Sequence, residues 1–530
     1  MSTKASSRDE PLLSTRWTIG IACVLAAAVF ATIRVLGLRQ FGAEDGGITA
    51  ALAYMVKIGY RPYTDIQTTG FPPLYFLLGG AAFKLLGVSW QSLVTLTAAF
   101  AALSLVAQTW LLERARFGRM TAIAVATLTQ CATLLPLSNW WYNQMTSVLG
   151  TLFASAALAL LARPKDRGVW TALVLSAALL SWSKPNVAAL LLLGVGVALL
   201  LSDRTRITGP LLMLSAAIAS VVGLVLVGVN PALVIQSYLS AAGRVSPGNF
   251  IDFFWVNDHG EAVRTLALLV PGLAAGLVAA FAWARSGHDN VVRTSALAAI
   301  SGVAILASFV AMGTNNDHNL VEVPLIILGC VTLIRVSGLN GRSILRGIVL
   351  GALGLSIAAL AVTGMYSAFA RERIESIGPN LFYEDVALSR VGGNAFMADV
   401  QTGPAFKQAI SDVSTVLRLN PSLTAADTQV FFGPRLLEMY PEFGIAPPKG
   451  LPTWWGLYAD GQPATGALVR IFVAEMPALA VFYRGDYTFY PTSLLEVLRT
   501  RYDVYNWGSL TLHARHGANV QLPNGATRAN

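Results

Sequence analysis

Long apolar runs separated by short polar connections occupy the first two thirds of the chain. A helix needs about 20 apolar residues to cross the hydrocarbon core of a membrane. Eleven runs meet or approach this length and are predicted to span at 17–38, 89–112, 120–138, 144–162, 168–183, 185–201, 207–229, 264–284, 294–313, 320–337 and 345–367. The fifth and sixth runs meet at residues 183–186, which indicates either a tight turn or a broken helix, and we favour the turn. The pattern predicts an α-helical polytopic membrane protein.

The pattern changes after residue 367. Residues 368–530, called the tail below, alternate turn signals with short runs typical of strands and longer runs typical of helices. The strand-like runs lie at 429–432, 468–473, 479–483 and 502–512, and the helix-like runs lie at 404–418 and 491–500. The tail is therefore predicted to be a small C-terminal α/β domain, separate from the membrane domain at 17–367.

The composition agrees with a membrane protein. Of the 530 residues, 55% are hydrophobic and 12% are charged, whereas ordinary soluble domains have about 25% charged residues. This excludes a soluble enzyme. The three cysteines, Cys23, Cys131 and Cys330, all lie in apolar runs, so neither a disulfide framework nor a cysteine metal site is indicated. The formal charge of +9 is compatible with nucleic-acid binding or with basic cytoplasmic loops.

The positions of the charges decide between these two interpretations. Residues 1–16 are polar and contain Lys4, Arg8 and Arg16, which places the N-terminus in the cytoplasm and makes 17–38 a retained helix. The cytoplasmic segments then hold sixteen basic and six acidic residues, at 1–16, 113–119, 163–167, 202–206, 285–293 and 335–346. The rest of the chain has a net charge of −1, so no nucleic-acid partner is indicated. Eleven spans place the tail outside the cytoplasm, in a multi-pass plasma-membrane protein.

The first outer loop, residues 39–88, is richer in polar and aromatic groups than a simple connection requires. Apolar residues recur at helical spacing over 48–58, which predicts a short amphipathic helix in the membrane interface with Asp45 at its start. A second apolar stretch, 73–86, is short for a span and is predicted to be another interfacial helix. Asp45 is either a simple N-cap or a cap that also presents one oxygen to a substrate.

Motifs in this loop have a characteristic order. Asp45 lies 17 positions before Pro62. Pro62 belongs to a Gly-x-x-Pro-Tyr-x-Asp motif at 59–65, and a Pro-Pro-Leu-Tyr run follows at 72–75. An acidic helix start after the first span, followed by these motifs, resembles the GT-C glycosyltransferases that use polyprenyl-phosphate sugars. The similarity is to the branch of the protein mannosyltransferases and the lipid A sugar transferases.

The resemblance has one departure and several further supports. The family usually has Asp-Glu-Gly at the helix start, whereas this chain has Gly46 in place of the Glu and has Glu44 before the Asp. Three more polar stretches resemble the family, at Trp141–Asn143, Ser183–Asn186 and Asn315–Asn319. The resemblance covers roughly residues 15–370, and the tail is similar to the extracytoplasmic domain that many members have.

The resemblance implies transfer of a hexose or pentose from a polyprenyl-phosphate donor to an acceptor hydroxyl outside the cytoplasm, with inversion at the anomeric carbon. Asp45 is then the catalytic base that removes the hydroxyl proton. The departing phosphate requires a cation, for which Lys184 is favoured because a charge beside a membrane-embedded turn is costly. The other candidate substrate-binding residues are Glu44, Arg61, Asp65, Tyr142, Asn143, Asp317 and His318.

Several of these residues have a second interpretation. Lys184 and Arg61 are also suited to contact lipid headgroups, and Asp65 either orients the acceptor or pairs with Arg61. Asp45, Asp65 and His318 are candidate ligands of a divalent metal ion, although no spacing requires one. The main alternative function is a transporter or flippase, but the chain shows no internal repeat. The acceptor is a glycan, a lipid or a protein, and the expected location is the bacterial inner membrane.

Overall fold

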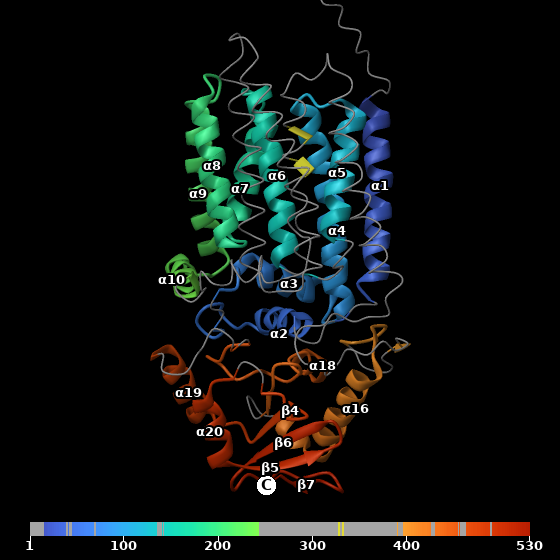
Figure 1. Cartoon of the computed structure of the whole chain (residues 1–530), viewed down its shortest axis with the longest axis vertical. Coiled ribbons are helices and arrows are strands. Elements are labelled where there is room, and N and C mark those ends of the chain that lie inside the picture. Colours follow the sequence, from blue (N-terminus) through green and yellow to red (C-terminus); the bar gives the residue numbers. More distant parts are fainter. Residues whose placement is uncertain are drawn as a thin grey trace, which may run out of the picture.

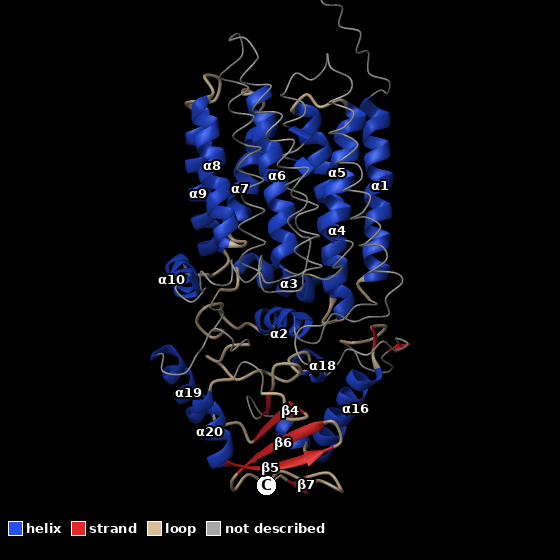
Figure 2. Cartoon of the chain, viewed as in Figure 1, coloured by secondary structure: helices blue, strands red, loops and turns tan. Residues whose placement is uncertain are grey.

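The computed structural model combines a bundle of long helices, a layer of short helices at one end of the bundle, and the tail (Figure 1). Figure 2 shows that the strands lie in the tail and that the bundle is helical. The described residues are 15–38, 41, 45–67, 70–134, 140, 142–242, 327–328, 331–332, 389–390, 396–425, 430–453, 455, 463–487 and 490–529.

Seven described helices run side by side in the bundle, and their bounds agree with the first seven predicted spans to within four residues. They are α1 (Thr15–Leu36), α4 (Trp90–Arg114), α5 (Arg119–Leu134), α6 (Tyr142–Ala162), α7 (Arg167–Ser181), α8 (Pro185–Leu201) and α9 (Thr208–Leu226). The spans predicted at 264–284, 294–313 and 345–367 lie outside the described residues, as does 320–337 except for four positions. Because α7 ends at Ser181 and α8 begins at Pro185, a turn joins them.

The bundle has the burial pattern of a membrane domain. Helices α1, α4, α6 and α9 are long and apolar enough to cross a membrane. The most apolar 18-residue stretch of α6 is 94% buried and that of α9 only 22%. Helix α9 exposes large apolar side chains such as Leu211 and Leu226, an arrangement that lipid tolerates and water does not. The chain is therefore a multi-pass membrane protein with α6 at the centre of its bundle.

Polar groups fix the ends of the bundle helices opposite the tail. The Asp166 carboxylate accepts hydrogen bonds from the N–H groups of Gly168 at 3.0 Å and Val169 at 3.4 Å, which satisfies unpaired donors in the first turn of α7. The same carboxylate binds Nη1 of Arg114 at 2.8 Å. One side chain thus caps α7 and ties it to the end of α4.

Two shorter helices, α2 (Asp45–Lys57) and α3 (Pro73–Leu86), cross the end of the bundle that faces the tail (Figure 1). Both helices were expected, but α2 lacks the exposed side of an amphipathic helix. Every residue from Ala50 to Ala53 has 0% exposure, because α2 is packed between α3 and the tail. The expectation of an exposed polar side was wrong for α2, which is a buried element between two layers, and its placement in the membrane interface stays a prediction.

The tail contains a five-stranded sheet in the order β3-β4-β6-β5-β7. Its strands are β3 (Val430–Phe432), β4 (Leu479–Tyr483), β5 (Tyr502–Trp507), β6 (Leu510–Arg515) and β7 (Thr527–Arg528), with a separate pair β1 (Ser389–Arg390) and β2 (Gln401–Thr402). β3 and β4 are parallel, and the other pairs in the sheet are antiparallel. The described helices after α9 are α10 (Pro231–Ala242), α16 (Pro404–Leu419), α17 (Pro421–Ala425), α18 (Met439–Phe443), α19 (Pro463–Glu475) and α20 (Thr492–Arg501).

Two of the strand predictions in the tail need correction. Residues 468–473 lie in the helix α19, where Leu468 and Phe472 are four residues apart and both buried against Phe431 and its neighbours. The β-propensity of the run is outweighed by the helical spacing of its apolar side chains. The run 502–512 is a hairpin rather than one strand, since β5 ends at Trp507 and β6 begins at Leu510.

The tail packs directly on the helical layers. The N–H of Gln401 donates to the carbonyl of Leu38 at 2.7 Å, and the N–H of Trp90 donates to the carbonyl of Phe396 at 2.8 Å. The ring of Phe41 stacks on that of Phe406, with 5.4 Å between centroids. Further bonds join the loop after α2 to residues 447–452, through Tyr60 to Pro447 and through Gly450 to Asp65. The tail is therefore in direct contact with the helical layers and covers α2.

Candidate functional site

Asp45 is the first residue of α2, and the structure places it through its main chain. One helical turn carries the chain through 3.6 residues, so position 49 lies on the same side of α2 as position 45. Thr49 is 2% exposed, and its hydroxyl forms a hydrogen bond with the phenol of Tyr75 on α3. The side of α2 shared by positions 45 and 49 therefore faces α3 and the bundle.

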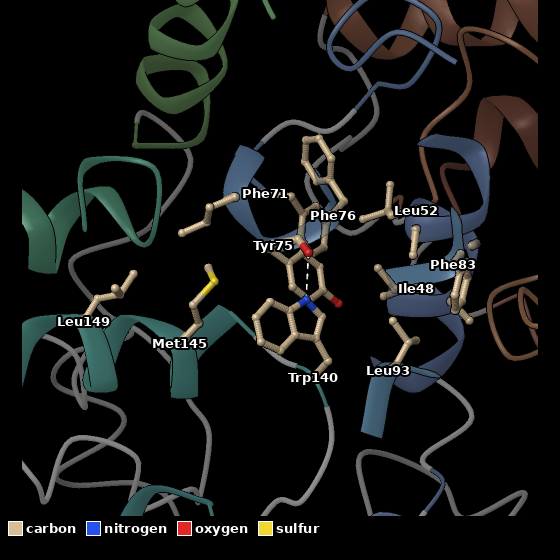
Figure 3. Packing of buried hydrophobic residues seen from close by; sticks show 14 of the residues in the cluster. Ile48, Leu52, Phe71, Tyr75, Phe76, Phe83, Leu93, Trp140, Met145 and Leu149 are labelled. Carbon is tan, nitrogen blue, oxygen red and sulfur yellow. Dashed lines mark hydrogen bonds between the residues drawn. The ribbon is translucent and has the colours of Figure 1, made fainter. Parts of the chain in front are cut away.

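Aromatic side chains from three segments surround this contact. Nε1 of Trp140 donates a hydrogen bond to the carbonyl oxygen of Tyr75 at 2.7 Å, which is the dashed line in Figure 3. The Thr49 hydroxyl also reaches the carbonyl of Trp140, at 3.4 Å. Figure 3 shows Trp140 and Tyr75 meeting between Ile48 of α2 and Met145 of α6. These bonds fix α2, α3 and the segment before α6 against one another.

Tyr142 and Asn143, two of the predicted substrate-binding residues, lie at the start of α6 beside this cluster. The ring of Tyr142 meets the rings of Tyr75 and Phe71 edge to face, each at 5.9 Å between centroids. Tyr142 is partly exposed, whereas Asn143 is only 2% exposed. A partly exposed phenol next to a buried amide offers both an apolar surface and hydrogen-bonding groups, as small-molecule sites require.

Lys184 is brought to the same end of the bundle. It occupies the position immediately before α8, its main-chain N–H donates to Oγ1 of Thr146 on α6 at 3.1 Å, and the residue is 8% exposed. The neighbouring carbonyl of Trp182 accepts from the N–H of Leu74 at 3.3 Å. A cation thus stands in the turn that contacts both α6 and the start of α3, which suits an anion with several negative oxygens.

Arg61 and Asp65 form a different arrangement. Nε of Arg61 contacts Oδ2 of Asp65 at 3.0 Å, and the side chains are 68% and 19% exposed. The hydrogen bond from Arg61 lowers the pKa of Asp65, with smaller contributions from the Arg61 main chain and from Lys449. The Asp65 carbonyl accepts from Gly450 of the tail. This ion pair shapes the loop on which the tail rests, and it agrees with the pairing interpretation of Asp65.

The remaining candidates cannot be placed. Glu44, Asp317 and His318 lie outside the described residues. Within the part of the chain that is described, no group of three His, Cys, Asp or Glu side chains is arranged to hold a metal ion. The proposed ligand set of Asp45, Asp65 and His318 is therefore not tested, and Asp65 is already engaged by Arg61.

Sequence reasoning overlooked three residues at the site. Thr49 lies one turn after Asp45, so helical spacing alone would have found it. Tyr75 ends the Pro-Pro-Leu-Tyr run, but its contact with Thr49 has no local signal. Glu438 of the tail lies against Gly47 of α2, and nothing in the sequence near position 438 indicates this contact.

Comparison with solved structures places this architecture among known folds. No family model matches the sequence, and no curated protein matches it. The structure is similar to that of ArnT from Cupriavidus metallidurans bound to undecaprenyl phosphate, with TM-score 0.50, 12% identity, and coverage of 95% of this chain and 99% of that chain. Apo ArnT gives TM-score 0.49 at 13% identity, covering 95% and 99% of the two chains.

A second neighbour is the oligosaccharyltransferase of Archaeoglobus fulgidus in its apo form, with TM-score 0.48, 13% identity, and coverage of 97% of this chain and 76% of that chain. The similarity to ArnT extends over nearly the whole of both chains. This chain therefore shares the fold of ArnT, a fold similarity that agrees with the architecture implied by the sequence resemblance.

Proposed function

We propose that the protein is an inverting glycosyltransferase that moves a sugar from a polyprenyl-phosphate donor to an acceptor hydroxyl. The observation that carries the proposal is that Tyr142 and Asn143 open α6 and Lys184 precedes α8 at the end of the bundle that α2 and α3 cross, with Tyr142 packed on Tyr75 of α3 and α2 beginning at Asp45. A fold neighbour binds undecaprenyl phosphate, which supports a lipid-linked donor.

The proposed reaction is a single displacement. The Asp45 carboxylate takes the proton of the acceptor hydroxyl as its oxygen attacks the anomeric carbon. The bond from that carbon to the phosphate oxygen breaks at the same time, and both electrons of the bond leave with the polyprenyl phosphate. Attack on the side opposite the leaving phosphate inverts the anomeric configuration.

Lys184 is proposed to bind the leaving phosphate. The phosphate gains negative charge as the bond breaks, so a fixed ammonium group stabilises the transition state more than the ground state. The main-chain bond to Thr146 fixes the backbone from which the Lys184 side chain extends, and the residue is 8% exposed. Tyr142 and Asn143 are proposed to hold the sugar, the phenol ring by packing and the amide by hydrogen bonds.

The sequence places this end of the bundle outside the cytoplasm. Basic residues gather on the opposite side in the loops before α5, α7 and α9, as the positive-inside rule expects. Soluble nucleotide sugars do not reach a site outside the cytoplasm, so a lipid-linked sugar is the favoured donor. The tail on this side is proposed to contribute to acceptor binding.

The test is a transfer assay with the purified full-length protein in lipid. A panel of undecaprenyl-phosphate hexoses and pentoses is supplied with glycan, lipid and peptide acceptors, and free undecaprenyl phosphate and glycosylated acceptor are measured with and without EDTA. We expect equal amounts of both products and an inverted anomer for one donor. Movement of donor across vesicles without release of undecaprenyl phosphate would instead indicate a flippase.

A further inference from the structure

Glu438 lies where the tail touches the first turn of α2. It immediately precedes α18, which packs against α2 (Figure 1). A methyl group on Gly47 would lie 2.5 Å from Oε2 of Glu438 and 3.5 Å from Cβ of Leu437. The carboxyl group therefore occupies the space of a side chain at position 47, and only glycine allows this approach.

The Glu438 carboxyl is withdrawn from water without compensation. The residue is 0% exposed, and neither carboxyl oxygen meets a hydrogen-bond partner among the described residues. An unpaired buried polar group costs about 1–3 kcal/mol, and more when charged. Burial raises the pKa of Glu438 well above its ordinary value; its own main chain opposes this shift, and the nearby Glu442 adds to it. A buried group of this kind requires an explanation.

The neighbouring Glu442, unlike Glu438, has a clear structural role within the tail. Oε2 of Glu442 accepts a hydrogen bond from the main-chain N–H of Met397 at 2.9 Å. Glu442 thus ties α18 to another segment of the tail. Glu438 makes no such bond to a described residue, and its carboxyl lies instead against α2. Its position is therefore not explained by the internal structure of the tail.

The first turn of α2 is covered by Phe41 on one side and by the tail on another. A methyl group on Gly46 would lie 3.0 Å from the ring of Phe41, which itself stacks on Phe406 of the tail. Gly47, about 100° further round the helix, is covered by Glu438. Neither glycine has a side chain of its own with which to fix the turn, so these neighbours fix it instead.

Helix α3 holds the start of α2 from a third side. Thr49, one turn after Asp45, is bonded to Tyr75 of α3. The backbone that carries Asp45 is therefore held between a hydrogen bond from α3 and a close contact from the tail. A displacement of about 1 Å at a reacting group is enough to reduce a rate by about 100-fold.

We propose that Glu438 is a positioning residue: by packing against Gly47 it holds the first turn of α2, and with it Asp45, in the geometry that transfer requires. The inference rests on the proposed function of Asp45. It makes docking of the tail a condition for transfer, because the residue that completes the turn comes from the tail. The contact with Gly47 depends on the shape of the side chain, so an uncharged side chain of the same shape is sufficient.

The experiment compares kcat and the donor KM of the full-length wild type with those of Glu438→Ala, Glu438→Gln and Gly47→Ala. We expect Glu438→Ala to lower kcat by about 100-fold while the donor KM stays within about twofold. Glu438→Gln keeps most of the activity because glutamine has nearly the same shape. Gly47→Ala lowers kcat because its methyl group displaces the carboxyl.

The double variant Gly47→Ala with Glu438→Ala tests the contact itself. The new methyl group enters the space that truncation leaves, so kcat should be about tenfold higher than in either single variant, a non-additive result expected only of residues in contact. The control is Glu496→Ala on α20, a 59% exposed carboxylate, which should behave as wild type. Each kcat is expressed per folded protein, measured by thermal denaturation.

Two results would overturn the inference while the proposed function stood. One is a wild type that transfers sugar together with a Glu438→Ala variant of unchanged kcat per folded protein. The other is a Glu438→Gln variant as inactive as Glu438→Ala, since it would show that charge and not packing matters. A wild type that releases no undecaprenyl phosphate from any donor would refute the proposed function itself.

Discussion

The main-chain N–H of Lys184 donates a hydrogen bond to Oγ1 of Thr146 at 3.1 Å, which joins the start of α8 to the first turns of α6. The carbonyl of Trp182 accepts from Leu74 at 3.3 Å and ties the same turn to α3. A buried basic residue is thus held at a fixed place beside Tyr142. Donor binding should depend on this cation.

Replacing Lys184 by Met keeps the length of the side chain and removes its charge. We expect the affinity for undecaprenyl phosphate to fall by at least tenfold, because an ion pair with phosphate outside bulk water is lost, and kcat to fall as well. Binding is measured by titration of the labelled lipid into protein in nanodiscs. The matched control, Lys57→Met, removes an exposed lysine at the end of α2, and equal losses in both variants would remove Lys184 from the site.

Asp45→Asn tests the proposed base. The amide has the same shape but does not accept a proton, so transfer should fall by about 100-fold or more. Folding and binding of undecaprenyl phosphate should be retained. Release of undecaprenyl phosphate is followed under single-turnover conditions, with Asp203→Asn in an exposed loop before α9 as the control. Wild-type transfer by Asp45→Asn would exclude Asp45 as the base.

Thr49→Val removes the hydroxyl that binds Tyr75 and keeps the branched shape. Loss of this hydrogen bond costs about 1 kcal/mol of stability, and the freedom gained by the first turn of α2 should lower kcat by about tenfold with little change in donor KM. Thr49→Ser retains the hydroxyl and should stay near wild type. If the serine variant loses as much activity as the valine variant, the hydroxyl is not what positions the turn.

Asp65→Asn tests the assignment of the Arg61 pair to the loop rather than to catalysis. Because Arg61 is largely exposed, the ion pair contributes little to stability. Transfer should remain within about twofold of wild type in the assay of undecaprenyl phosphate release. A loss of transfer comparable to that of Asp45→Asn would instead favour Asp65 as a substrate-binding residue or a metal ligand.

The buried His513 should make the folding stability of the tail decrease at low pH. Burial lowers its pKa to about 4, while the ring stays bonded to the hydroxyl of Tyr487 at 2.8 Å. Below the ordinary value of about 6.5 the unfolded chain takes up a proton that the folded tail does not, so stability falls as the pH drops from about 7 to about 4. The fall attributable to His513 is at most roughly 3 kcal/mol.

This pH dependence is measured by thermal denaturation of the full-length protein across that range. His513→Gln should weaken the dependence, whereas His516→Gln, at an exposed position, should not change it. An identical pH profile in the wild type and in His513→Gln would contradict the assignment.

The sequence predicts well which candidate residues lie at the same end of the bundle. Tyr142 and Asn143 open α6, and Lys184 immediately precedes α8. Span counting predicts that these two helices begin on the same side of a membrane. Hydropathy also located the bundle helices, because crossing a membrane imposes a length and a composition on every span separately. These are local properties, so the sequence states them directly.

The sequence by itself determined the described helices of the bundle and the helix that begins at Asp45, and it predicts their orientation across the membrane. Only the tertiary structure decided that α2 is buried, that Thr49 meets Tyr75, and that Glu438 lies against Gly47. The spacing of apolar residues in α2 predicts a helix with one side in water. The tail that covers α2 lies hundreds of residues later in the sequence, so this local pattern does not reveal the contact. Burial and long-range contact depend on which surfaces pack together, and no local pattern contains that information.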